Sequence, residues 1–214
     1  MFKGIISITS YKKRIDTISK TLFSLIENCK GFHIVLVLSS DEFKDTELPK
    51  DLQLLINNNL VELLWTKENT YTFKKMLPTM EKYPDYPIIT ADDGCRYTCN
   101  YAETLYNLWN EHKDFIVSFN MFNRFNVCYG GGGSGILFPP NCFKIKPITQ
   151  AIIDTKHDDY YYGCLAVLNK CKWLFINRKA KDTNFINFNN NREVSGNFRN
   201  ENAICQIIKK ELDL

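Results

Sequence analysis

The chain has 214 residues, of which 44% are hydrophobic, and this suits one compact domain with its own core. Its 27 basic and 24 acidic side chains give a formal net charge of only +3, which is too small to predict a general nucleic-acid binder. No apolar run approaches the roughly 20 residues that span a bilayer, and the first residues lack a secretory cleavage site. We therefore predict a cytoplasmic protein.

The cysteines give no indication of a disulfide framework. All eight are scattered through a chain that is too long and too apolar to need disulfides, so we expect reduced thiols. Cys95 and Cys99 have no second cysteine or histidine pair at metal-ligand spacing, which argues against structural zinc.

Basic side chains are concentrated in residues 170–199, which hold seven of them against two acidic ones. This excess predicts contact with an anionic ligand, or peripheral contact with the inner face of a membrane. A solvated face without a ligand is the alternative, and the sequence leaves both open.

The first 120 residues alternate strand-like and helix-like patterns, which predicts a mostly parallel sheet covered by helices. Apolar residues at helical spacing predict helices over residues 12–28 and from residue 101 onward. The predicted strands are short apolar runs at residues 4–9, 33–38, 60–65, 87–91 and 115–119.

The second half of the chain has a weaker pattern. A glycine cluster at residues 130–135 predicts a loop before a strand at 136–138. We expect a helix from Asp158, a strand at residues 173–176 and an amphipathic helix at the end of the sequence. Residues 180–200 are rich in asparagine and poor in apolar side chains, so we predict a flexible loop there.

Polar side chains follow three of the predicted strands, and ligands of open parallel sheets bind at such strand ends. A nucleotide needs partners for its base, its ribose and its pyrophosphate, which these three ends can provide. Helix capping is the alternative for any single member. The residues are Thr9, Ser10, Tyr11 and Arg14 after the first strand, Ser39, Ser40 and Asp41 after the second, and Asp92 and Asp93 after the fourth.

Asp92 and Asp93 are adjacent carboxylates, which repel each other unless positive charge lies beside them. A divalent cation that bridges a diphosphate would relieve this repulsion and neutralise a leaving group. The alternative is an Asp-Asp-Gly turn in which one carboxylate caps the next helix.

Four segments together resemble the GT-A glycosyltransferases, near family two and its bacterial lipopolysaccharide and capsule enzymes. They are ITSYKKR at residues 8–14, IITADDG at 88–94, YGGGGSGILFPPNCF at 129–143 and HDDYYYGCLAVLNK at 157–170. The resemblance implies an α/β fold of the GT-A, Rossmann-like kind, with a mixed, mostly parallel sheet flanked by helices. It implies a single domain over residues 1–214, with a nucleotide-sugar-binding half at 1–95 and an acceptor-side half at 96–214. The family's metal motif usually continues to a third aspartate, where this chain has Gly94.

The resemblance also implies a site for a nucleotide-sugar donor. Residues after the first two strands would hold the base and ribose, and the acidic pair would contact the ribose and a diphosphate bound to Mg²⁺ or Mn²⁺. One of two lysines would contact a pyrophosphate oxygen, with a solvated helix face as the alternative. In that order, the residues are Thr9, Ser10, Tyr11, Arg14 and Asp41, then Asp92 and Asp93, then Lys74 and Lys75.

Asp158 and Asp159 resemble the acidic pair at the start of the family's acceptor-side helix. In an inverting transferase a carboxylate takes the proton of the acceptor hydroxyl, and Asp159 is the expected base. The adjacent charge of Asp158, together with partial burial, should raise the pKa of the pair. Capping of the helix is the alternative.

The same resemblance places Gly131, Gly132, Gly133 and Tyr160 around the sugar and acceptor pocket. Glycine lets the backbone approach a ligand closely, and a tyrosine ring can stack on a sugar. The cluster is not a phosphate-binding P-loop, because it precedes a strand and lacks the Gly-Lys-Ser/Thr ending.

The leading hypothesis is transfer of a sugar from a UDP-sugar to a glycan or lipid-linked acceptor in polysaccharide biosynthesis, with inversion and with metal assistance. A catalytically inactive nucleotide-sugar-binding or scaffold protein is the first alternative, because of Gly94. A nucleotidyltransferase is the second, although such enzymes usually need a glycine-rich loop where this chain has residues 10–14.

Overall fold

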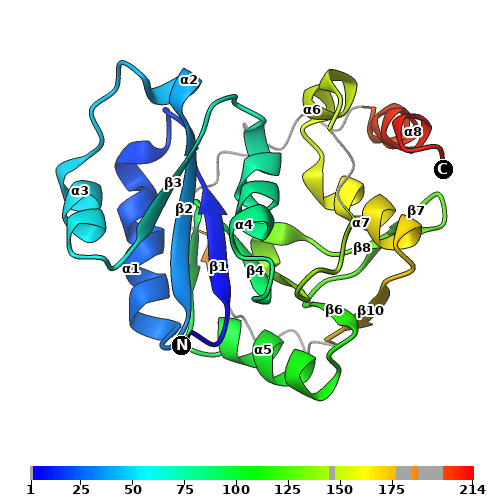
Figure 1. The fold of residues 1–214 in the computed structure, drawn as a ribbon, viewed down its shortest axis with the longest axis horizontal. Helices are drawn as coiled ribbons and strands as arrows, with labels where there is room; N and C mark the ends of the chain where they lie inside the picture. Colours follow the sequence, from blue (N-terminus) through cyan, green and yellow to red (C-terminus); the bar gives the residue numbers. More distant parts are fainter. Residues whose placement is uncertain (1, 145–147, 177–184, 188–199) are drawn as a thin grey trace.

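A seven-stranded sheet runs through the computed structural model, which describes residues 2–144, 148–176, 185–187 and 200–214 (Figure 1). The strand order is β10-β6-β9-β4-β1-β2-β3, and every neighbouring pair is parallel except those of β9, which is antiparallel to β4 and β6. The predicted mixed, mostly parallel sheet is therefore confirmed. The strands are β1 (Ile5–Thr9), β2 (His33–Ser39), β3 (Glu62–Thr66), β4 (Ile88–Asp92), β6 (Phe115–Ser118), β9 (Ile136–Phe138) and β10 (Lys172–Phe175).

Helices contribute to a separate hydrophobic core on each face of this sheet. One core contains α1 (Ile18–Asn28), α3 (Lys50–Asn57) and α5 (Tyr101–Glu111). The other contains α4 (Leu77–Lys82), α6 (Gln150–Thr155), α7 (Asp158–Leu168) and α8 (Glu201–Glu211). The smaller elements are α2 (Ser40–Phe43), the 3-10 turns η1 (Ile15–Thr17), η2 (Tyr71–Lys75) and η3 (Gly132–Ser134), and two strand pairs, β5 (Cys95–Tyr97) with β11 (Phe185–Asn187) and β7 (Phe122–Arg124) with β8 (Val127–Tyr129).

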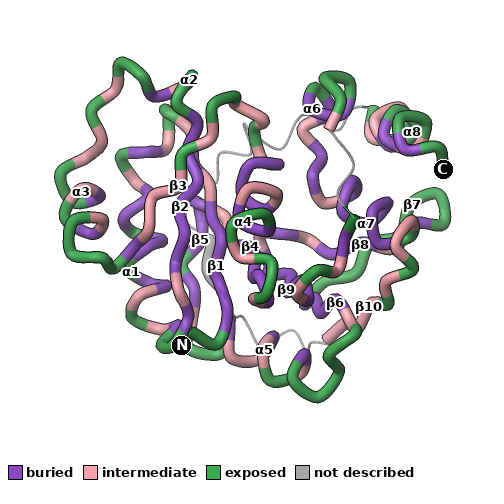
Figure 2. Tube along the Cα trace, viewed as in Figure 1, coloured by how far each residue is buried: buried purple, intermediate pink, exposed green. Residues whose placement is uncertain are grey.

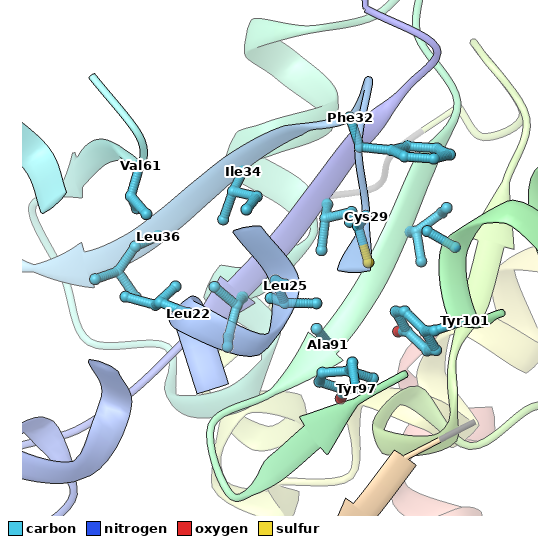
Figure 3. Close-up of a cluster of buried hydrophobic side chains, with 14 of the residues drawn as sticks. Leu22, Leu25, Cys29, Phe32, Ile34, Leu36, Val61, Ala91, Tyr97 and Tyr101 are labelled. Carbon is cyan, nitrogen blue, oxygen red and sulfur yellow. The ribbon is translucent and has the colours of Figure 1, made fainter. Parts of the chain in front are cut away.

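The two cores explain why the central strands are nearly continuous apolar runs. Side chains alternate between the faces of a strand, so Leu36 of β2 joins the core under α1 while Val35 and Val37 join the opposite core. Figure 2 shows the central strands buried along most of their length, and Figure 3 shows Leu22 and Leu25 of α1 beside β2. A strand covered on both sides cannot expose a polar face, and its functional residues are therefore left to its ends.

The predicted strands are all present, with ends displaced by one or two residues. The helix predicted over residues 12–28 begins only at Ile18, because the segment before it forms η1 and a turn that carries Arg14 towards Asp93. Sequence patterns did not predict α3, α4 or the small strands, which are short and take their stability from packing.

Several other expectations have outcomes in the fold. All eight cysteines are free thiols, as predicted.

Residues 185–187 form β11 against β5, which corrects the prediction of a loop at that point. Most of the predicted 180–200 loop lies outside the described residues. Of the basic residues in 170–199, only Lys170 and Lys172 are described. Within the described ranges, the helices are too short or too polar to cross a membrane.

Leu36→Ala should lower the free energy of unfolding by about 2 to 5 kcal/mol, because Leu36 is fully buried and its truncation leaves a cavity under α1. Urea denaturation followed by circular dichroism measures this. Leu54→Ala is the control, since Leu54 is 62% exposed, and it should change stability by less than about 0.5 kcal/mol. Equal effects of the two variants would contradict the two-core description.

Candidate active site

The ends of β1 and β4 lie side by side, and they bring Asp93 against the segment that follows β1. Thr9 pairs with Asp92 in the sheet register. One residue further along each strand, the Ser10 hydroxyl donates to Asp93 Oδ2 (2.7 Å), and Arg14 Nη1 donates to Asp93 Oδ1 (2.8 Å). Burial raises the pKa of Asp93, against the opposing effects of Ser10 and Arg14. Both carboxylate oxygens are thus held inside the protein.

This arrangement rules out the helix-capping alternative for Asp93. The element that follows the Asp-Asp-Gly turn is the strand β5 and not a helix. The carboxylate of Asp93 instead joins β4 to the turn after β1, and its backbone carbonyl accepts a bond from the Thr21 hydroxyl of α1 (3.0 Å). Asp93 therefore fixes the geometry at the end of the sheet.

Thr9 and Tyr11, the other predicted residues at this end, are partly exposed. The Thr9 hydroxyl donates to the Val37 carbonyl (2.7 Å), and the Arg14 guanidinium lies 5.5 Å from the centre of the Tyr11 ring. The ring and the guanidinium together form a surface of the kind that can stack on a planar base.

Asp92 is held in place by a tyrosine that the sequence did not indicate. The hydroxyl of the buried Tyr97, in β5, accepts a bond from the Asp92 N–H (2.8 Å) and donates to the Gly133 carbonyl (3.0 Å). Tyr97 thus connects the end of β4 to the glycine segment. The Asp92 side chain is 46% exposed, whereas the side chains of Asp93 and Asp158 are only 9% and 8% exposed.

Lys75 lies between the two acidic pairs. Its Nζ is 3.0 Å from Asp92 Oδ1 and 3.1 Å from Asp158 Oδ2, and its side chain is only 4% exposed. Burial would lower the pKa of Lys75, but the charges of Asp158, Asp92 and Asp159 outweigh it, so the pKa is raised well above the usual value. The solvated-face alternative for this lysine is therefore wrong.

Lys74 is equally buried but has different partners. Its side chain is 2% exposed, and its Nζ donates to Glu42 Oε2 (3.2 Å) and Asn69 Oδ1 (2.9 Å). Glu42 also accepts a bond from the Lys12 N–H (3.1 Å). The acidic side chain of α2 that turns towards this lysine is Glu42, whereas the predicted Asp41 is exposed. The sequence offered two adjacent acids here and no means of choosing between them.

Asp159 lies at the start of α7 and is partly buried. Its Oδ1 accepts a bond from the Gly132 N–H (3.0 Å). Burial, reinforced by the charge of Asp158, raises the pKa of Asp159 to about 8, against the lowering effect of Lys75. The predicted direction is confirmed for this residue.

The N-cap of α7 is His157, whose Nδ1 accepts a bond from the Tyr160 N–H (3.4 Å). Neither aspartate is the side-chain cap of the helix, and the alternative that aspartates favour the first turn of a helix whatever their function stays open. Asp158 and Asp159 occupy the first turn, where their charge also suits the positive end of the helix dipole.

The backbone of the glycine segment lies so close to the acidic groups that a side chain at Gly132 or Gly133 would displace them. A Cβ at Gly132 would lie 2.9 Å from both Lys75 Nζ and Asp159 Oδ1, and one at Gly133 would lie 2.5 Å from Asp92 Oδ2. The neighbouring Gly131 is less constrained, since its Cβ would lie 3.2 Å from the Phe122 ring. The backbone of the glycine segment thus lies close to the protein's own charged side chains.

Tyr160 does not face a pocket, which corrects the prediction that it stacks on a sugar. It is fully buried, its ring packs edge-on against Tyr129 (5.4 Å between centroids), and its hydroxyl donates to the Arg124 carbonyl (3.4 Å). Tyr161 and Tyr162 are also fully buried. All three belong to the core because most of α7 is covered by surrounding elements.

Two cavities of about 610 and 330 Å³ lie away from the aspartates. The larger is lined by Met80, Tyr83 and Phe143 and includes Ile88 at the other end of β4. None of the predicted site residues lines either of these two cavities.

The residues present do not fit the expected Mg²⁺ or Mn²⁺. Both oxygens of Asp93 are engaged by Ser10 and Arg14, and Asp92 Oδ1 is engaged by Lys75. Position 94, the family's third aspartate, is glycine. Among the described residues, no three His, Cys, Asp or Glu side chains gather in a way that could hold a metal ion.

No protein-family model matches this sequence, and no curated protein matches it. The fold, however, matches two crystal structures of TarS from S. aureus. The first match has a TM-score of 0.50 at 15% identity and covers 84% of this chain and 36% of that one. The second, to TarS 1-349, has a TM-score of 0.50 at 16% identity and covers 84% of this chain and 59% of that one.

The chain has the GT-A fold. TarS is a GT-A glycosyltransferase of family two, so the fold expected from the four sequence segments is confirmed. At this level of identity the likeness establishes the GT-A fold and not the reaction. The chain also spans only about a third to three fifths of the length of the TarS chains that it matches.

Asp159→Asn should remove a pH-dependent loss of stability. A carboxyl whose pKa is raised from 3.8 to about 8 binds more protons in the folded protein than in the unfolded one, so its contribution to stability falls as the pH rises between these values. Relative to wild type, the variant should gain roughly 1 to 3 kcal/mol in free energy of unfolding between pH 5 and pH 8.

Urea denaturation across this pH range measures the difference. Asp114→Asn, at an exposed position, is the control and should follow the wild-type profile. Parallel profiles for wild type and Asp159→Asn would show that Asp159 is not the perturbed group.

Proposed function

We propose that this chain is a glycosyltransferase, which transfers a sugar from a nucleotide diphosphate, most simply a UDP-sugar, to a hydroxyl group of a glycan or lipid-linked acceptor with inversion. One observation carries the proposal. Asp92 and the pair Asp158 and Asp159, which are far apart in the sequence, converge around Lys75 in a chain with the GT-A fold.

Asp159 is the proposed base. In an inverting transfer, the acceptor oxygen attacks the anomeric carbon opposite the departing nucleotide and loses its proton to a carboxylate. A pKa raised to about 8 makes Asp159 a stronger proton acceptor than an ordinary aspartate. Because Asp159 Oδ1 already accepts from the Gly132 N–H, the proposal assigns the proton to Oδ2.

The donor nucleotide is proposed to bind at the ends of β1 and β4. Tyr11 and Arg14 provide a planar surface for the base, and Asp93 holds Arg14 in position. Asp92, whose side chain is 46% exposed, lies next to Thr9 across the sheet and is proposed to contact the ribose. Lys75, which contacts both Asp92 and Asp158, is proposed to contact the diphosphate.

The acceptor and cellular setting are also proposals. Polysaccharide synthesis at the cytoplasmic face of a membrane would fit the resemblance to lipopolysaccharide and capsule enzymes. It would also fit the basic residues of segment 170–199.

A nucleotide-sugar-binding protein without catalysis is the second candidate function, and Gly94 is the feature that favours it. The nucleotidyltransferase alternative has less support, because the segment after β1 contains no glycine and is occupied by the contacts of Ser10 and Arg14 with Asp93.

Asp159→Asn should lower kcat by about 10² to 10⁴, the usual contribution of a general base, while the affinity for the donor stays within about threefold. The measurement is release of UDP from UDP-sugars in the presence of a panel of glycan and lipid-linked acceptors. Asp114→Asn should retain wild-type activity, since its side chain lies on the surface.

The result separates the candidate functions. Full activity of Asp159→Asn would contradict the assignment of the base. Tight UDP binding without any UDP release across the panel would favour the non-catalytic binding protein, and absence of binding to any nucleoside diphosphate would contradict the donor site.

A further inference from the structure

The ammonium group of Lys75 lies at the point where the carboxylates of the site converge. It is 3.0 Å from Asp92 Oδ1 and 3.1 Å from Asp158 Oδ2. Lys75 and Asp158 are almost fully buried, with side chains 4% and 8% exposed, whereas Asp92 is much more open. The charged cluster therefore meets solvent on its Asp92 side.

A divalent cation shared by Asp92 and Asp158 would have to occupy nearly the same place. Its oxygen ligands would lie about 2.0 to 2.6 Å away, and the Lys75 nitrogen already lies about 3 Å from the same two carboxylates. Asp93 offers no substitute ligand, because Ser10 and Arg14 engage both of its oxygens. In this arrangement the ammonium group and a metal ion exclude each other.

Lys75 also keeps an N–H donor that a ligand can use. An ammonium has three N–H donors, and among the described residues this one contacts two carboxylates, which leaves one donor for another acceptor. A phosphate oxygen that approaches past Asp92 can accept the remaining bond.

We propose that Lys75 takes the place of a divalent cation, so that this chain binds the diphosphate of its donor without metal. The inference rests on the proposed donor site and deepens it. It replaces the expected Mg²⁺ or Mn²⁺ by a cation that is part of the chain, and it gives a role to a site in which the family's third aspartate is Gly94.

Isothermal titration calorimetry with Mn²⁺ alone tests whether Lys75 occupies the position of a metal ion, and it requires no assumption about activity. Wild type should show no site tighter than about 1 mM. Lys75→Met leaves Asp92 and Asp158 without their cation, and it should bind Mn²⁺ at least about tenfold more tightly than wild type. Lys75→Arg keeps the charge and should behave like wild type.

Lys74→Met is the matched control for this titration. Lys74 is equally buried, but its acidic partner is the single carboxylate of Glu42, so its removal should create no Mn²⁺ site. A stoichiometric Mn²⁺ site in wild type that Asp92→Asn abolishes would overturn the proposal. An unchanged Mn²⁺ affinity in folded Lys75→Met would also overturn it, and if that variant does not fold, wild type and Lys75→Arg decide the question.

Titration with UDP, once in EDTA and once in Mn²⁺, tests whether the Lys75 ammonium binds a diphosphate without metal. The affinity of wild type should be the same within about twofold in both conditions, and Lys75→Met should bind UDP at least about tenfold more weakly in EDTA. Wild-type binding that is tenfold tighter with Mn²⁺ would overturn the inference. If UDP, ADP and GDP bind in neither condition, the proposed donor site fails, and with it the use of Lys75 for a diphosphate, whatever the titration with Mn²⁺ alone shows.

Discussion

The site depends on the ion pairs that Lys75 makes with Asp92 and Asp158. A charged group that is removed from water is costly unless it is paired, and Lys75 meets this requirement with carboxylates from two separate parts of the chain. The 3-10 turn η2 is tied to β1 by the bond from the Ser7 hydroxyl to the Lys75 carbonyl. Loss of this cation would leave two carboxylates in mutual repulsion, so Lys75 links the end of β4 to the start of α7.

The two members of each acidic pair in the site have different partners. Asp93 is engaged by Arg14, while Asp92 next to it contacts Lys75 and remains open. At the start of α7, Asp158 contacts Lys75, whereas Asp159 accepts a bond from the Gly132 N–H and has its pKa raised. Neighbouring carboxylates with different partners can serve different purposes, and this difference is the physical basis for choosing Asp159 as the base.

Much of the fold could be predicted because both faces of the sheet are covered. Strand β2 is apolar at residues 34–38, and residues 88–91 lead directly into two aspartates whose importance was visible from their mutual repulsion. The roles of Glu42 and Tyr97 were not visible, because an acid beside another acid and a tyrosine in a short strand have no distinctive pattern. Tyr160 was assigned wrongly for a related reason, since an aromatic run reads alike in a core and in a pocket.

The sequence by itself determined the α/β class, the positions of the main strands along the chain and the positions of the two acidic pairs. These follow from local properties, namely apolar runs, turn residues and adjacent charges, which do not require knowledge of what lies opposite. Only the tertiary structure decided that both lysines are buried, that Asp93 is closed by Arg14 and that Gly132 and Gly133 lie against the acidic groups. These are contacts between segments far apart in the chain, and burial, which decides whether a charge is solvated or paired, is set by such contacts alone.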